Sequence, residues 1–168
     1  ENVYLKGDFI LDPQMNIMKA KKHLPVTSRM YENGYPFFKG EMTITGSLYW
    51  DGESQAMLEI SGRYQTAEVS LNGQKTHFVL DDRKDITRHL LPGVNTVTVT
   101  LRSSLRNLFG PHHFKLNPEP TGVSPDQFEF RGQWEQGKTA RYYTPDYHFV
   151  PFGADKILMI TKDGNQSS

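Results

Sequence analysis

Polar and apolar residues alternate with a period of two through the middle of this chain. The alternation covers four stretches, residues 41–50, 55–61, 66–71 and 94–102. Successive side chains of a β-strand point to opposite faces, so each stretch predicts a strand with one apolar face. Trp50 ends the apolar face of the first stretch, and we expect its ring in the core.

Turn-forming residues separate the predicted strands. The separators are Asp51-Gly52, Gly62-Arg63, Asn72-Gly73 and Pro92-Gly93, and Asn-Gly in particular suits a tight hairpin because both residues tolerate a positive φ. Short strands at regular spacing predict an all-β fold, an antiparallel β-sandwich. The 168 residues fit one such domain, spanning 1–168.

Weaker patterns predict the remaining elements. Shorter strands are expected at 3–11, 77–80, 147–152 and 156–161. Tyr147 and Phe149 alternate with His148, which predicts that both rings lie in the core. Residues 85–91 predict one helical turn with Asp85 as its N-cap, and residues 117–139, rich in Pro, Gly, Gln and Glu, predict a long loop excursion.

Composition and charge exclude several classes of partner. The 19 basic and 19 acidic residues cancel, whereas binding to nucleic acid or to an anionic membrane needs a cationic surplus. No apolar run approaches the roughly 20 residues of a membrane-spanning helix. The chain has no cysteine, which excludes disulfides and thiolate metal sites but leaves the compartment open.

The order of motifs between Gly34 and His113 resembles a known family. The motifs are Tyr35-Pro36-Phe37-Phe38-Lys39-Gly40-Glu41, Ala67-Glu68-Val69-Ser70-Leu71-Asn72-Gly73, Asp85-Ile86-Thr87, Leu91-Pro92-Gly93-Val94-Asn95, and the ending Ser104-Leu105-Arg106-Asn107-Leu108-Phe109-Gly110-Pro111-His112-His113. Together they resemble the jelly-roll sugar-binding domain of family 2 glycoside hydrolases and of large bacterial α-L-rhamnosidase-like enzymes, the ending being closest to the second group. The return strand at 147–153 matches loosely.

This resemblance implies a galactose-binding-like jelly roll and a role beside a catalytic domain of the same protein. In the resembling enzymes the chemistry belongs to a separate barrel domain. The start at Glu1, without methionine or leader, likewise favours a piece of a larger protein. A periplasmic or extracellular bacterial location is slightly favoured, although the sequence does not determine it.

The polar ending of the motif series is the candidate carbohydrate site. Sugars are held by aromatic rings that stack on C–H patches and by polar side chains that bond hydroxyls. Arg106, Asn107, His112 and His113 would supply the polar groups, with Gly110-Pro111 as a sharp bend. The rings would come from the long loop and the segment after it: Trp134, Tyr142, Tyr143 and Tyr147.

Each of these residues also has a structural interpretation. His112 and His113 could form a hydrogen-bonded anchor for the excursion loop, and Trp134 could be a plug against a neighbouring domain. Asn72, Asp85, Thr87 and Asn95 suit turn architecture, not ligand contacts.

Metal binding and catalysis have weaker support. Adjacent histidines on an extended segment point to opposite faces, so no transition-metal site is predicted at 112–113. We expect no cofactor, although Asp81 or Asp82 could contribute to a structural calcium site of the kind found in galactose-binding-like sandwiches. The carboxylates show no pairing that would suit glycoside hydrolysis, and there is no nucleophile elbow, phosphate loop or metalloprotease motif.

The predicted function is therefore a non-catalytic accessory module, which binds carbohydrate or frames the catalytic domain of a large glycoside hydrolase. A purely structural interdomain module without a ligand is the main alternative. A small stand-alone lyase or esterase on a jelly roll is a third hypothesis, and it requires a cleft in which acid, base and oxyanion donor converge.

Overall fold

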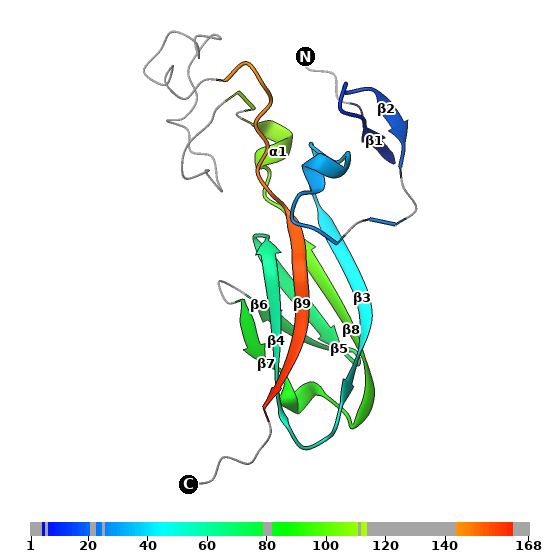
Figure 1. The fold of residues 1–168 in the computed structure, drawn as a ribbon, viewed down its shortest axis with the longest axis vertical. Helices are drawn as coiled ribbons and strands as arrows, with labels where there is room; N and C mark the ends of the chain where they lie inside the picture. The colour runs from blue at the N-terminus through cyan, green and yellow to red at the C-terminus, as the bar shows by residue number, and fades with distance from the viewer. Residues whose placement is uncertain are drawn as a thin grey trace. The chain divides into compact units, whose positions relative to one another are not determined.

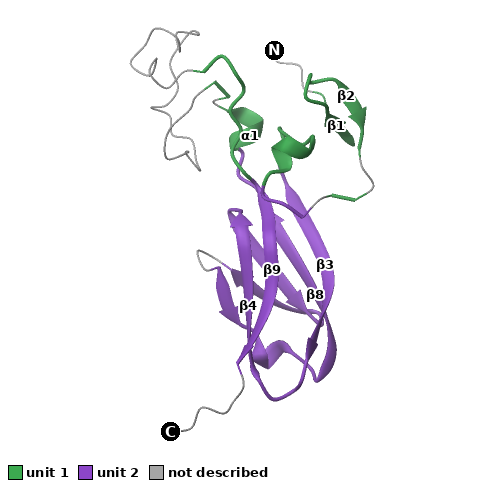
Figure 2. Cartoon of the chain, in the orientation of Figure 1, with its two compact units in different colours: residues 1–25, 29–38, 106–151 green, residues 26–28, 39–105, 152–168 purple. Residues whose placement is uncertain are grey.

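The computed structural model describes residues 5, 7–20, 23–24, 26–78, 82–110, 112–113 and 144–162. The chain divides into two compact units (Figure 2). Unit 1 comprises Glu1–Pro25, Arg29–Phe38 and Arg106–Pro151, and unit 2 comprises Val26–Ser28, Lys39–Leu105 and Phe152–Ser168. That all 168 residues form one domain stays a prediction.

Unit 2 is an all-β antiparallel sandwich (Figure 1). One sheet has the strand order β3-β8-β5-β6, formed by Glu41–Trp50, Gly93–Arg102, Thr66–Leu71 and Gln74–Phe78. The other has the order β7-β4-β9, formed by Arg83–Asp85, Gln55–Arg63 and Gly153–Lys162. The predicted fold class is confirmed.

The core of the sandwich comes from the alternating apolar faces. In β4 and β5 every second residue is buried, and in β8 the buried face is the one that carries Asn95 and Leu101. The side chain of Trp50 is 8% exposed, and its indole N–H donates to the carbonyl oxygen of Ser54 at 2.8 Å. The period-two pattern therefore predicted the inward faces of these strands correctly.

Two turns at one end of unit 2 are joined by asparagine side chains. Asn72 and Gly73 have φ values of 48° and 86° and connect β5 to β6. The Asn95 side chain is fully buried; its Oδ1 accepts from the backbone N–H of Leu91 at 2.7 Å, and its Nδ2 donates to the carbonyls of Leu91 and Gly93. Nδ2 of Asn72 also donates to Oδ1 of Asn95 at 2.7 Å, a link between the two turns that the sequence pattern did not predict.

A glycine pair permits an irregularity between β4 and β9. The pairing register shifts between Ser61 and Gly62. Gly62 and Gly153 have φ values of 153° and 128°. A Cβ on Gly62 would clash with the backbone of Gly153, and a Cβ on Gly153 with the backbone of Thr27. Both positions therefore require glycine.

Unit 1 contains short elements only. A hairpin pairs β1 (Phe9–Leu11) with β2 (Ile17–Lys19), and its turn is held by Asp12, whose carboxylate accepts from the backbone N–H groups of Gln14 and Asn16. A hydrogen bond from the Asn16 side chain is the main cause that lowers the pKa of Asp12, and the two backbone bonds add to it. The 3-10 helix η1 (Met30–Asn33) and the single-turn helix α1 (Arg106–Phe109) complete the unit.

The weaker predictions had mixed outcomes. The strand predicted at 156–161 lies inside β9, and the predicted turn at 85–91 contains the 3-10 helix η2 (Thr87–His89). The predicted N-cap was wrong, because the helix begins two residues after Asp85 and its N-cap is Ile86; Oδ1 of Asp85 accepts from the N–H of Thr87 at 2.9 Å. The strand predicted at 77–80 overlaps β6, and the strand predicted at 3–11 is reduced to β1. Residues 3, 4, 6, 79 and 80 lie outside the described residues.

The strand predicted at 147–152 was wrong. Its only β pairing is a bridge at Phe152, because residues 144–150 bond to the segment around His112 instead of to a strand. The pattern did not predict β2, β7, η1 or α1, all of four residues or fewer. Elements this short are stabilised by tertiary contacts more than by their own periodicity.

Candidate functional site

The candidate site lies in unit 1, where α1 ends in a sharp bend. The N–H of Gly110 donates to the carbonyl of Arg106 at 2.9 Å and closes the single helical turn. Gly110 has a φ of 80°, and a Cβ there would meet the backbone nitrogen of His112 at 2.7 Å. The bend turns His112 back toward the helix, so that its Nε2 donates to the carbonyl of Asn107 at 2.9 Å.

Asn107 pairs with the backbone of a segment 43 residues further along the chain. Its Nδ2 donates to the carbonyl of Val150, and its Oδ1 accepts from the N–H of Val150, both at 2.8 Å. The side chain thus imitates the edge of a β-strand. Since Asn107 is only 5% exposed, it acts as a backbone anchor in this arrangement.

The two histidines bind the same returning segment. The N–H of His148 donates to the carbonyl of His112 at 2.6 Å, and the N–H of Thr144 donates to the carbonyl of His113 at 3.0 Å. Nδ1 of His113 lies 3.2 Å from the carbonyl of Thr144, to which it donates. The described segments on either side of the predicted excursion are therefore hydrogen-bonded to each other.

An aromatic cluster surrounds these histidines; we define it as Phe37, His112, His113, Tyr147 and Phe149. The ring of Phe37 stands perpendicular to three of the others, at centroid distances of 5.4 Å to His112, 5.8 Å to Tyr147 and 5.0 Å to Phe149. Tyr147 stacks on Phe149 at 5.7 Å and lies 5.0 Å from His113. Edge-to-face and stacked rings at these distances attract one another beyond their burial.

Tyr147 is the exposed member of the aromatic cluster. The sequence pattern placed it in the core, but 51% of the residue is accessible to solvent. The prediction was wrong because residues 144–150 do not form a strand. Alternate side chains in this segment therefore do not point to the inner and outer faces of a sheet. An exposed tyrosine ring that neighbouring rings hold in place is suited to stacking on a ligand.

Burial favours the neutral form of one histidine at this site. Desolvation is the main cause that lowers the pKa of His112; the charges of Arg106 and His113 lower it further, and the hydrogen bond to Asn107 opposes them. His112 is therefore neutral at pH 7. Arg106 is 1% exposed, so its guanidinium acts from inside the unit and not at its surface.

The structure brings four of the six predicted site residues together. Arg106 and Asn107 are buried, and His112 and His113 are half-buried beside Tyr147. Trp134 and Tyr142 lie outside the described residues. That these residues bind carbohydrate stays a prediction.

The sequence reading missed Phe37 and Phe149 as members of this site. Phe37 belongs to the run Tyr35-Pro36-Phe37-Phe38, one of the motifs that carry the family resemblance. The aromatic run before a strand was the available signal. It did not predict the contact between Phe37 and His112, because the two residues are far apart in the sequence.

Four described carboxyl groups differ in pKa from the acid catalyst of a glycosidase. A glycosidase acid needs a raised pKa to hold its proton at neutral pH. Four described carboxyl groups have a lowered pKa instead, and these are Asp12, Asp51, Glu68 and Asp85. Each of them accepts hydrogen bonds in a turn or an ion pair.

The described residues form neither a cluster of metal ligands nor a membrane-spanning helix. Among the described residues, no three His, Cys, Asp or Glu side chains are grouped so as to hold a metal ion. Asp81 lies outside the described residues, so the calcium prediction stays untested. Within the same part of the chain, no helix has the length and hydropathy needed to cross a membrane.

A solved structure shares this fold. The structure titled "Structure of Rhamnosidase from Novosphingobium sp. PP1Y" is similar over 94% of this chain and 14% of that chain, with a TM-score of 0.53 and 19% identity. At this identity the likeness shows a common all-β fold, and this chain corresponds to a small part of that protein. No family model and no curated protein matches the sequence.

Proposed function

We propose that this chain is a non-catalytic accessory module of a large α-L-rhamnosidase-like glycoside hydrolase. The observation that carries the proposal is the fold likeness, which covers nearly all of this chain but only 14% of a rhamnosidase chain. A module that corresponds to so small a part of that enzyme is consistent with a role beside a separate catalytic domain. The lowered pKa values of Asp12, Asp51, Glu68 and Asp85 are consistent with the same proposal.

The aromatic cluster is the proposed contact with carbohydrate. Tyr147 offers a ring face to sugar C–H groups, and the imidazoles of His112 and His113 lie 5.6 Å and 5.0 Å from it between ring centroids. Hydrogen bonds to backbone hold both imidazoles, so the site is ordered before a ligand arrives. Such preorganisation reduces the entropic cost of binding.

Titration with rhamnose- and galactose-containing oligosaccharides tests this function by calorimetry. We expect millimolar or tighter binding by the wild-type chain and a loss of about tenfold for Tyr147→Ala, since tenfold corresponds to about 1.4 kcal/mol. Tyr49→Ala is the matched control, because Tyr49 is 71% exposed on the sandwich of unit 2. An absence of binding by the wild type at millimolar sugar overturns the carbohydrate role.

A structural interdomain module is the second candidate. The observation that favours it is that the amide of Asn107 is fully engaged by Val150, while the imidazoles of His112 and His113 bond backbone carbonyls. In that case, Tyr147 contacts a neighbouring domain of the parent protein. Protection of Tyr147 from chemical modification in the parent protein, with no sugar binding by the isolated chain, would favour this candidate.

A further inference from the structure

The outer face of the four-stranded sheet carries a regular array of hydroxyl groups. On this face, threonines of β3 lie opposite threonines of β8. Thr43 pairs with Thr100, and Thr45 pairs with Thr98. Their Oγ1 atoms are 3.4 Å and 3.3 Å apart. High β propensity alone explains threonine in strands, so the array by itself does not identify a site.

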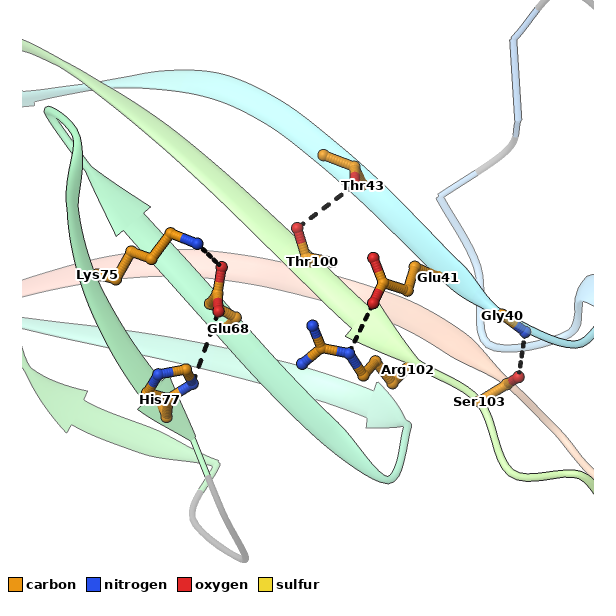
Figure 3. Close-up of polar contacts among 9 residues, drawn as sticks. All are labelled: Gly40, Glu41, Thr43, Glu68, Lys75, His77, Thr100, Arg102 and Ser103. Carbon is orange, nitrogen blue, oxygen red and sulfur yellow. Dashed lines mark hydrogen bonds and ion pairs between the residues drawn. The ribbon is translucent and has the colours of Figure 1, made fainter.

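A charged cluster stands beside these hydroxyls (Figure 3). On β5 and β6, the Glu68 carboxylate lies 2.8 Å from Nζ of Lys75 and 3.9 Å from Nδ1 of His77. On β8, Nε of Arg102 donates to Glu41 at 2.7 Å. Thr100 lies opposite Glu68 in the β5–β8 pairing. The hydrogen bond from Lys75 is the main cause that lowers the pKa of Glu68, and the charge of Arg102 adds to it.

These side chains are held in place but keep unused hydrogen-bonding capacity. An arginine has five N–H donors in a planar fork, and in the described part of the chain Arg102 uses only its Nε donor. Its side chain is 45% exposed, and that of Lys75 is 63% exposed. Glu68 is only 19% exposed, so its carboxylate is less accessible than the Lys75 and His77 side chains that lie next to it.

The charges of the cluster determine which ligands it suits. Two carboxylates, Glu41 and Glu68, balance the cations Lys75 and Arg102, and each pairs with one of them. A balanced surface does not concentrate anions such as phosphates. Donors and acceptors placed together on a neutral surface complement a neutral polyhydroxyl compound, in which each hydroxyl both donates and accepts.

We propose that Glu68, Lys75, Thr100 and Arg102 form a subsite for one neutral sugar of an oligosaccharide on the outer face of this sheet. Arg102 and Lys75 donate to sugar oxygens, and Glu68 accepts from sugar hydroxyls. This subsite rests on the proposed carbohydrate function and adds a second contact surface, in unit 2.

The test is calorimetric titration of the full 168-residue chain with the same rhamnose- and galactose-containing oligosaccharides. Arg102→Lys keeps the charge and can keep the ion pair with Glu41, but it removes the forked donors. We expect it to weaken binding at least fivefold without a change in the melting temperature. Thr45→Val, on the same face but outside the subsite, is the matched control and is expected to bind like the wild type.

The Tyr147→Ala variant separates this inference from the proposed function. If the wild type binds and Tyr147→Ala loses binding while Arg102→Lys does not, the subsite is overturned and the aromatic cluster stands. If Arg102→Lys loses binding and Tyr147→Ala does not, the subsite is supported and the aromatic cluster is excluded. A wild type that binds neither oligosaccharide at millimolar concentration overturns both.

Discussion

At the scale of single residues, this chain uses buried polar side chains to hold backbone turns. Asn95 and Asn107 are both almost inaccessible, and each satisfies two or more backbone groups. A buried amide that lost these partners would leave N–H and C=O groups unpaired in a medium where water cannot replace them. The stability of the turns therefore depends on these two side chains.

Replacement of Asn95 tests this dependence. Asn95→Ala leaves the Leu91 N–H, the Leu91 and Gly93 carbonyls and the Asn72 amide without their partner. We expect a loss of about 2–4 kcal/mol in the free energy of unfolding, measured by chemical denaturation. Thr96→Ala, at the next and exposed position, should change stability by less than about 0.5 kcal/mol; equal losses for the two variants would contradict this account.

The pH dependence of stability tests the burial of His112. Because its pKa is lower in the folded than in the unfolded chain, the unfolded chain takes up the proton first as the pH falls through about 6.5. Stability is thus complete above that pH and declines below it. Between pH 7.5 and 5.5 we expect the wild type to lose more stability than His112→Gln, and parallel curves would argue against a desolvated imidazole.

At the scale of elements, glycine determines how β4 pairs with β9. The register shift after Ser61 lets β9 continue along β4 over its full length from Gly153 to Lys162. Gly62 and Gly153 have positive φ values, and at both positions neighbouring backbone atoms occupy the space that a Cβ would need. The bulge is thus a feature of the sequence at two particular positions.

Substitution of Gly62 tests the bulge. Gly62→Ala introduces a Cβ against the backbone of Gly153 and Ala154 at a strained φ, so we expect a loss of about 2–4 kcal/mol in unfolding free energy. Gly46→Ala is the matched control, because Gly46 lies in β3 with only a 4.0 Å contact to Val97. That control should be neutral or stabilising by up to about 1 kcal/mol; a neutral Gly62→Ala would show that the strands can re-pair.

At the scale of the whole molecule, the chain combines a β-sandwich with a second unit of short elements. The likeness to a rhamnosidase chain covers 94% of this chain. Both candidate carbohydrate contacts lie on positions that strands or backbone hydrogen bonds hold. Rigid support of this kind suits recognition. Four described carboxyl groups have a lowered pKa and are poor proton donors at neutral pH: Asp12, Asp51, Glu68 and Asp85.

An activity assay at this scale tests the accessory role. We expect the isolated chain to release no product from an aryl α-L-rhamnoside at pH 5–8, under conditions in which an authentic α-L-rhamnosidase is active. The physical reason is that a glycosidase needs one carboxyl group that stays protonated near neutral pH. Turnover that persists through repeated purification would support the stand-alone enzyme hypothesis instead.

The amino-acid sequence by itself determined the sandwich and its inward faces. Alternation and turn residues are local properties, so β3, β4, β5 and β8 could be predicted together with the burial of Trp50, Val99 and Leu101. The sequence also marked residues 106–113 as unusual, because a polar, Gly-Pro-containing segment follows a regular strand.

Only the tertiary structure decided what those residues touch. Asn107 meets Val150, and Phe37 meets His112, across separations of 43 and 75 residues, and no local pattern encodes such pairs. For the same reason Tyr147 was expected inside and is exposed, since its neighbours bond to His112 and His113 and not to a sheet. Local periodicity determines which face of a strand turns inward, whereas the packing of distant segments determines which side chains remain at the surface to bind a ligand.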